Sequence, residues 1–147
     1  MIAVDTNILV YAHREDSPWF PAASACLCRV AEGRARWAIP WPCVYEFFSV
    51  VTNPRIWRDA ASTSEQAWRQ IEAWLASPSL RLLAETDGFH AVLQGLARRP
   101  RVRGPLVHDA RVAALCLAHG VEALVTRDRD FSLFPELPTV DPFSAMA

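Results

Sequence analysis

The stretch Met1-Ile2-Ala3-Val4-Asp5-Thr6-Asn7 decides how this chain folds. Residues 2–4 form a short apolar run that predicts a buried strand, and the run ends in a carboxylate followed by two small polar residues. In open α/β sheets, ligands bind in the crevice outside the carboxyl ends of the strands. Asp5 therefore has two interpretations: a functional residue at a sheet edge, or, with Thr6 as the alternative, the cap of a helix that begins near Ile8.

The composition indicates one compact domain over residues 1–147. Hydrophobic residues make up 52% of the chain and charged residues 21%, which suits a folded protein with its own core. No apolar run approaches the roughly 18 residues needed to span a membrane. The first apolar segment meets a charge at Asp5 with no basic region before it, which argues against a signal peptide. We therefore expect a cytoplasmic protein.

The cysteines give no sign of a disulfide framework or a metal site. Cys26, Cys28, Cys43 and Cys116 contain no C-x-x-C pair. We expect buried, reduced thiols.

All 15 basic residues are arginine, and the sequence contains no lysine. This excludes mechanisms that need a lysine, such as the P-loop, Schiff-base chemistry and the lysine that accompanies the aspartates of phosphoryl-aspartate enzymes. The net charge of -1 also argues against binding nucleic acid through bulk positive charge. Any such role must rely on a local arginine patch.

Apolar runs and helical segments alternate along the chain. Short apolar runs predict strands at residues 2–4, 37–39, 80–84, 121–125 and, at an edge, 139–140. Helical spacing predicts helices at residues 8–13, 18–32, 43–53, 62–77, 87–97 and 109–119. This alternation predicts an α/β fold with a mainly parallel sheet of four to five strands.

The helix at residues 62–77 has a capping signal and two tryptophans. Ser62 and Glu65 have the S-x-x-E spacing of a capping box. Trp68 and Trp74 fall on its apolar face, where core packing is the favoured interpretation and a dimer or partner interface is the alternative.

Glu46 is the one acid in an almost wholly apolar predicted helix. A lone carboxylate there is costly unless it meets a cation or a hydrogen-bond donor. Two interpretations stay open on this segment alone: a functional acid, or a residue on a narrow solvent stripe or paired with an arginine.

Two further acids occupy positions like that of Asp5. Asp128 follows the apolar run 121–125, and Asp109 opens a predicted helix, where helix capping is the alternative role. The carboxyl ends of parallel strands share one edge, and helices that follow strands begin at that edge. We therefore expect Asp5, Glu46, Asp109 and Asp128 to converge.

Four converging carboxylates require cations. Two negative charges about 4 Å apart repel by roughly 4 kcal/mol at an effective dielectric near 20. Ligation by oxygen alone suits hard ions, so we expect Mg²⁺ or Mn²⁺. Such ions activate water for attack at phosphorus, and the cluster predicts metal-assisted phosphodiester hydrolysis.

A loop rich in arginine precedes Asp109. Its arginines are Arg98, Arg99, Arg101 and Arg103, and the loop also contains two prolines and a glycine. A solvated surface loop is one interpretation, and an RNA-binding patch that contacts phosphates is the other.

Taken together, the acidic segments resemble the four motifs of the PIN domain, and their order resembles the VapC toxins of VapBC toxin-antitoxin systems. The resemblance covers nearly the whole chain and rests on Asp5-Thr6-Asn7, Tyr45-Glu46-Phe47, His108-Asp109-Ala110, residues 124–131 and, for one VapC subgroup, residues 51–55.

The resemblance assigns roles to the acids. It implies that Asp5 and Asp109 are the principal metal ligands. Glu46 and Asp128 would complete the catalytic quartet, Asp128 either directly or through water.

The resemblance also implies roles for three polar neighbours. Asn7 and Thr126 match positions that support the site by hydrogen bonding. Asp130 has two possible roles: assisting a second metal, or bracing the loop before Phe131.

At the level of the whole protein, the resemblance implies a three-layer α/β/α sandwich with strand order 3-2-1-4-5. It implies an endoribonuclease toxin that cleaves RNA with Mg²⁺ or Mn²⁺. The implied partners are a second copy in a homodimer and a cognate VapB-like antitoxin, with no membrane.

Two rival functions remain. A catalytically silent PIN-like module would bind RNA or a partner without cleavage. A phosphoryl-aspartate enzyme would use Asp5 as a nucleophile, but the chain lacks lysine and has Asn7 where such enzymes have a second aspartate.

Overall fold

The computed structural model describes residues 1–144. Its centre is one parallel sheet with strand order β3-β2-β1-β4-β5, which confirms the expected topology. The strands are β1 (Ile2–Val4), β2 (Trp37–Pro40), β3 (Leu80–Leu83), β4 (Ala123–Val125) and β5 (Thr139–Val140).

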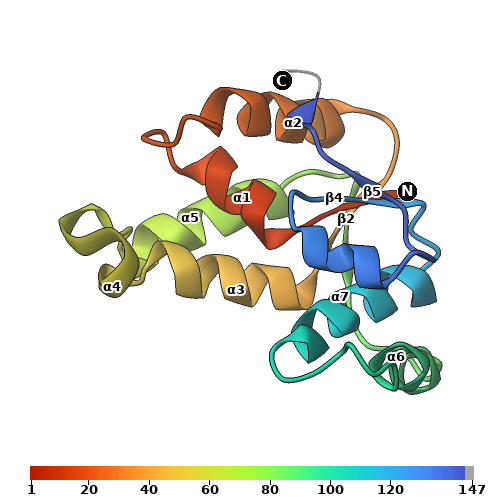
Figure 1. The fold of residues 1–147 in the computed structure, drawn as a ribbon. Coiled ribbons are helices and arrows are strands. Elements are labelled where there is room, and N and C mark those ends of the chain that lie inside the picture. Colours follow the sequence, from red (N-terminus) through yellow and green to blue (C-terminus); the bar gives the residue numbers. More distant parts are fainter. Residues whose placement is uncertain (145–147) are drawn as a thin grey trace.

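Helices connect the strands in the alternating pattern predicted from the sequence (Figure 1). The α-helices are α1 (Thr6–His13), α2 (Phe20–Glu32), α3 (Trp41–Val51), α4 (Pro54–Trp57), α5 (Ser64–Leu75), α6 (Phe89–Ala97) and α7 (Leu106–Ala118). Two 3-10 helices are also present, η1 (Arg58–Ala60) and η2 (Arg129–Leu133).

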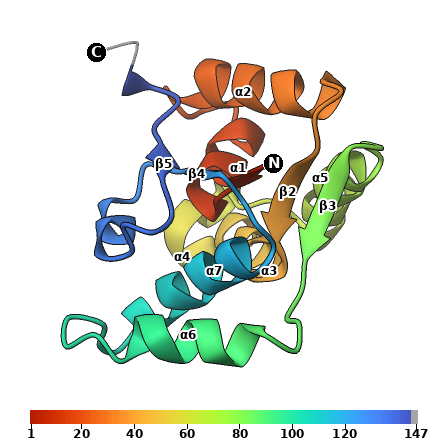
Figure 2. The same cartoon turned by 90° about the vertical axis from the view of Figure 1, so that its right-hand side faces the viewer.

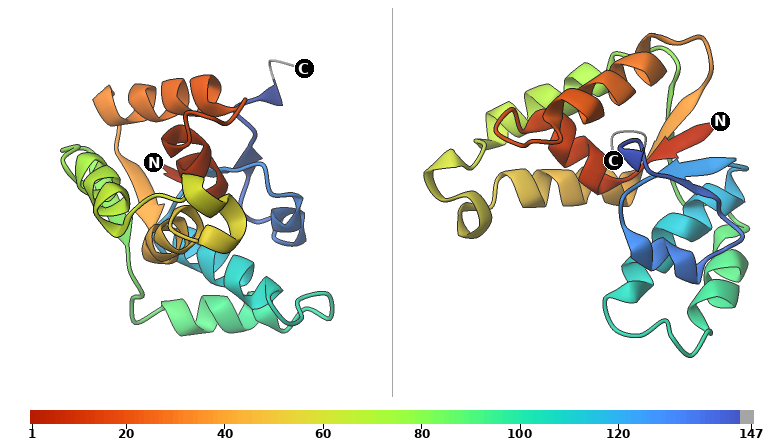
Figure 3. Two further views of the ribbon diagram at one scale, coloured as in Figure 1. Left: turned by 90° about the vertical axis from the view of Figure 1, so that its left-hand side faces the viewer. Right: turned by 45° about the horizontal axis from the view of Figure 1, so that its top comes forward.

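The helices form layers on both faces of the sheet. Figure 2 shows α1 and α2 over one face and α6 and α7 over the other. Helices α3 and α5 extend away from the carboxyl edge of the sheet, with α4 at their far end (Figures 1 and 3). The result is the expected three-layer α/β/α sandwich.

Strand β1 is the central strand, between β2 and β4. Ala3 pairs with Ala38 on one side and with Leu124 on the other, and its side chain is fully buried. The Asp5 amide then donates to the Val125 carbonyl at 3.1 Å, which fixes Asp5 at the carboxyl edge of the sheet.

The start of α7 differs from the prediction. The helix begins at Leu106, so Asp109 lies inside the first turn rather than at the first position. No side chain caps this helix, so its start lacks the capping residue that usually marks a helix N-terminus.

The capping box of α5 was predicted one residue too early. Thr63 and Gln66 form it, the Gln66 amide donating to Thr63 Oγ1 at 3.1 Å and the Thr63 amide to Gln66 Oε1 at 2.8 Å. The Ser62 hydroxyl is instead hydrogen bonded to His13 Nε2 at 2.8 Å. The Ser62 side chain thus contacts α1 and does not cap α5.

The cysteine prediction is correct for three of the four residues. Cys26, Cys43 and Cys116 are buried free thiols, whereas Cys28 is exposed on α2. In the part of the chain that the structure describes, no helix is both long enough and apolar enough to cross a bilayer.

The two tryptophans of α5 have different environments. Trp74 is only 7% exposed and packs edge-on against Phe47 of α3, with ring centroids 4.7 Å apart. Trp68 is 50% exposed and lies against Phe48 at 5.7 Å. Trp74 is thus a core residue, and Trp68 lies at the surface.

We predict that Trp74→Ala lowers the free energy of unfolding by about 3–5 kcal/mol, because it removes a large buried ring and leaves a cavity. Trp68→Ala is the matched control and should cost less than about 1 kcal/mol. Urea unfolding of both variants measures the difference. Equal losses would contradict the assignment of Trp74 to the core.

Candidate active site

The structure brings the four predicted acids to one place. Asp5, Glu46, Asp109 and Asp128 line a single cavity of about 320 Å³, which we call the acidic pocket. It lies at the carboxyl edge of the sheet, where β1 ends and α1 begins. The convergence expected from the sequence is therefore present.

Asp5 is the deepest of these acids, with only 5% of its surface exposed. Its Oδ2 accepts hydrogen bonds from Thr126 Oγ1 at 2.7 Å and Asn7 Nδ2 at 2.8 Å, and its Oδ1 accepts one from the Thr6 amide at 2.8 Å. The last contact makes Asp5 the N-cap of α1. Asp5 is thus the helix cap considered from the sequence and also lines the acidic pocket, and Thr6 is a helical residue rather than the cap.

Burial raises the pKa of the Asp5 carboxyl above its ordinary value. The hydrogen bonds from Thr126 and the Thr6 amide oppose this rise, and the charges of Glu46 and Asp128 add to it. A deep carboxylate surrounded by donors and other acids is well suited to share its charge with a cation.

Thr126 joins the ends of β1 and β4. Its hydroxyl donates to Asp5 and accepts from the Asp128 amide and from Asn7 Nδ2, both at 3.0 Å. Asn7 Oδ1 in turn accepts from the Arg127 amide at 3.2 Å. Asn7 and Thr126 therefore hydrogen bond to Asp5 and to each other, and their support of a catalytic site stays a prediction.

Asp109 extends from the first turn of α7 and is half-buried. Desolvation, followed by the charges of Asp128, Asp5, Asp130 and Glu46, raises the pKa of Asp109 to about 7 from an ordinary 3.8. Within residues 1–144, its carboxylate accepts no side-chain or backbone hydrogen bond. Burial, and after it the neighbouring negative charges, therefore disfavours the ionised form of Asp109.

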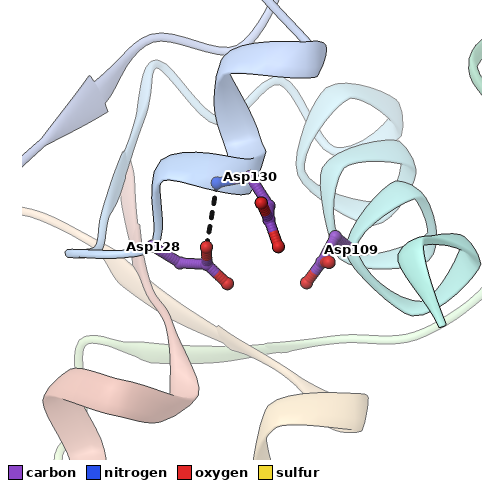
Figure 4. A group of neighbouring side chains, drawn as sticks. All are labelled: Asp109, Asp128 and Asp130. Atoms are coloured by element: carbon purple, nitrogen blue, oxygen red, sulfur yellow. Dashed lines mark hydrogen bonds between the residues drawn. The ribbon is translucent and has the colours of Figure 1, made fainter. Parts of the chain in front are cut away.

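Asp109, Asp128 and Asp130 form the tightest group of acids. One carboxylate oxygen from each lies within 4.8 Å of the others, and the three side chains point toward a common space (Figure 4). The Asp130 amide also donates to Asp128 Oδ1 at 2.9 Å at the start of η2. The backbone of Asp130 thus braces the loop, while its carboxylate is placed to act as a ligand.

Glu46 lies on the rim of the pocket and is exposed. Its Oε2 accepts a hydrogen bond from Thr6 Oγ1 at 3.2 Å, and it forms no ion pair within residues 1–144. It therefore occupies the solvent stripe considered from the sequence, and that stripe faces the acidic pocket. The contact with Thr6 was not anticipated.

Cys43 is a second residue near the site that sequence reasoning missed. It is fully buried, and its Sγ lies 3.6 Å from Asp5 Oδ1 as a hydrogen-bond donor. Burial, and then the charge of Asp5, raises its pKa well above the ordinary value of 9.0, so it remains a thiol. Cys43 precedes Glu46 by three residues and therefore lies on the same helix face, and this spacing could have indicated that it lies near the site.

The donor set of the acidic pocket fits a hard divalent cation. Asp5, Asp109, Asp128 and Asp130 offer carboxylate oxygens only, the ligands that Mg²⁺ and Mn²⁺ prefer. Across residues 1–144, no arginine or histidine forms a salt bridge with any of them. Among the described residues, hydrogen-bond donors to Asp5 offset part of this negative charge, but no cationic side chain neutralises it.

The arginine loop does not line the acidic pocket. Arg98, Arg101 and Arg103 are exposed, and Arg103 Nε donates to the Pro100 carbonyl at 2.9 Å. Arg99 pairs with Glu136 and donates to the Leu133 carbonyl at 2.7 Å. Arg99 therefore anchors the loop, which leaves three arginines available at the surface.

We predict that the metal-free protein loses stability as the pH rises from about 4 to about 7. The folded-state pKa of Asp109 is raised from 3.8 to about 7, so the folded chain holds this proton more tightly than the unfolded chain and loses that advantage on deprotonation. Asp109→Asn should reduce the pH dependence and be more stable than the wild type at pH 8.

Urea unfolding in EDTA at pH 5 and pH 8 tests this prediction. Asp59→Asn, which changes an exposed acid on η1, is the control and should behave as the wild type. Parallel pH profiles for Asp109→Asn and the wild type would refute the electrostatic coupling.

Comparison with known proteins places this geometry in a family. A family model described as PIN domain matches residues 2–137. Ribonuclease VapC48 of Mycobacterium tuberculosis is 33% identical over 140 residues, which cover 95% of this chain and 96% of the relative.

Two solved structures share the fold. The Mycobacterium tuberculosis toxin VapC20, described as cleaving the sarcin-ricin loop, superposes with a TM-score of 0.67 at 17% identity, over 90% of this chain and 93% of that one. A toxin-antitoxin complex from Klebsiella pneumoniae gives 0.63 at 19% identity, over 97% and 98%. The extent of the family match and the identity to VapC48 show that this chain belongs to the PIN-domain family, among relatives named VapC ribonucleases.

Proposed function

We propose that this protein is a metal-dependent endoribonuclease and the toxin of a type II toxin-antitoxin system. The observation that carries the proposal is the convergence of Asp5, Glu46, Asp109 and Asp128 in one pocket without a compensating cation from the described residues. The family match and relatives named ribonucleases support it.

In this proposal, Asp5 and Asp109 hold the metal ion, Mg²⁺ or Mn²⁺, with Asp128 and Glu46 completing the site. A bound ion of this kind lowers the pKa of water and stabilises charge on the leaving oxygen. Asp130 adds a carboxylate on the same side as Asp109 and Asp128. Asn7 and Thr126 keep Asp5 oriented through the hydrogen bonds described above.

The geometry gives little support to a phosphoryl-aspartate enzyme. Both oxygens of Asp5 already accept hydrogen bonds, and the residue is 5% exposed. The chain also lacks the lysine that such enzymes use. A role as an oriented metal ligand suits Asp5 better than a role as a nucleophile.

The proposed partners follow from the relatives. The similarity in fold to a toxin-antitoxin complex supports a cognate VapB-like antitoxin, and the family supports a homodimer. The RNA target is proposed as a class only, because PIN-type sites recognise RNA shape and unpaired segments.

We predict that purified protein, freed of antitoxin, cleaves RNA with Mg²⁺ or Mn²⁺ and not with EDTA. Asp109→Asn should reduce the rate at least about 100-fold, because it removes a direct ligand. It is a cleaner inactive variant than Asp5→Asn, since Asp109 accepts no hydrogen bond within residues 1–144, whereas Asp5 would lose buried ones.

Gel analysis of structured RNAs measures the cleavage, and Asp59→Asn is the charge-matched control. Cleavage that persists in Asp109→Asn would contradict the proposed site. Absence of metal-dependent cleavage of any RNA, together with binding, would favour the silent binding module.

A separate prediction concerns the arginine loop. Replacing Arg98, Arg101 and Arg103 together with glutamine should weaken RNA binding and reduce the slope of log affinity against log salt by up to about 2, at roughly 0.7 per phosphate contact. Arg99 is left intact because it holds the loop to Glu136. Titrations at several salt concentrations measure the slope, and an unchanged slope would make this a solvated loop without an RNA role.

A further inference from the structure

A second groove opens directly onto the acids. We call it the α3–α7 groove; its volume is about 440 Å³, and it shares Asp5, Glu46 and Asp109 with the acidic pocket. Beyond the acids, its walls include Pro42 and Tyr45 from α3 and, at the start of α7, Pro105, His108 and Arg111. A chain that crosses the acids can therefore continue into this groove.

An exposed aromatic ring, that of Tyr45, lines one wall of the groove. Tyr45 is 60% exposed, although it is a large apolar ring beside a polar site. Trp41, one helical turn earlier on α3, stacks against it with ring centroids 5.7 Å apart and planes 21° apart. The Tyr45 ring is thus supported on one side and accessible to solvent on the other.

The opposite wall provides positive charge. Arg111 lies on α7 two residues after Asp109 and is 40% exposed. Its Nη2 pairs with Glu85 at 2.9 Å, which leaves other N–H donors of the guanidinium free to bind a phosphate. His108, also exposed, adds a second polar group on this wall.

We infer that the α3–α7 groove is a subsite for one unpaired nucleotide next to the scissile phosphate, with its base stacked on Tyr45 and its phosphate bound by Arg111. This inference rests on the proposed ribonuclease function and adds two positioning residues to it. A flat aromatic ring beside a guanidinium is the combination by which proteins hold single-stranded nucleotides. A base inside a duplex has both faces covered by its neighbours and cannot stack on Tyr45, so the subsite selects unpaired RNA.

The first test replaces the aromatic ring. In EDTA, which prevents cleavage, Tyr45→Ala should bind a short fluorescent oligoribonucleotide of mixed sequence about 5- to 150-fold more weakly than the wild type. Tyr45→Phe keeps the ring, and with it the stacking face, and should bind within about twofold of the wild type. Fluorescence anisotropy gives the affinities.

Three controls make the result specific. Trp68→Ala removes another exposed aromatic ring, 50% exposed against 60% for Tyr45, from α5 outside the groove and should leave RNA affinity unchanged. The same RNA annealed to its complement should show no dependence on Tyr45. With Mg²⁺ present, Tyr45→Ala should raise KM for unpaired RNA more than it lowers kcat, since stacking is made before the transition state.

The second test concerns the guanidinium. Arg111→Gln should reduce the salt slope of RNA binding by about 0.7, the value for one phosphate contact on a single strand. Arg69→Gln is the matched control, because Arg69 also pairs with a glutamate at 2.9 Å but lies outside the groove on α5. The control slope should equal that of the wild type.

The outcomes separate this inference from the proposed function. Equal RNA affinity of Tyr45→Ala and the wild type would overturn the subsite, and so would Tyr45→Phe binding as weakly as Tyr45→Ala. Binding that depends on Tyr45, without metal-dependent cleavage by the wild type, would overturn the proposed function alone. Cleavage with no effect of Tyr45 or Arg111 on KM or affinity would overturn the subsite alone.

Discussion

The hydrogen bond from the Thr126 hydroxyl to the buried Asp5 carboxylate is the interaction on which the site depends. It links the end of β1 to the end of β4, and the same hydroxyl accepts from Asn7 and from the Asp128 amide. One small side chain thus sets the spacing between two acids that come from opposite ends of the sequence. The parallel pairing of β1 with β4 brings the strand ends that carry Asp5 and Asp128 together, and the hydrogen bonds of Thr126 then hold Asp5 and the Asp128 amide.

The site is also a concentration of negative charge that the fold must tolerate. The acids differ in burial, from Asp5 at 5% exposure to Glu46 at the solvent-exposed rim. The raised pKa values of Asp5 and Asp109 express the cost of this arrangement in the metal-free chain. Active sites commonly trade stability for function in this way, and here cation binding would offset the cost.

The α/β class with a parallel sheet and the convergence of the acids could be predicted from local pattern, whereas the strand order 3-2-1-4-5 was implied by the resemblance to the PIN domain. Asp5 and Asp128 follow apolar strands, and the sheet edge that they share is a consequence of parallel topology. The start of α7 was missed because no capping side chain marks it. Two further details involve contacts between distant segments, which local sequence patterns do not reveal. They are the hydrogen bond of Ser62 to His13, beside a capping box that begins at Thr63, and the pairing of Arg99 with Glu136. Metal ligation and RNA contacts remain predictions.

The bond between Thr126 and Asp5 spans 121 positions of the sequence, which has a consequence for synthesis. The ribosome adds Asp5 to the chain 121 residues before its partner Thr126, so this hydrogen bond is absent while the intervening chain is made. Contacts of such long sequence separation form late, after most of the chain is available. A growing polypeptide therefore lacks the assembled pocket until Thr126 and Asp128 have been made, and any activity of the site begins only after that point.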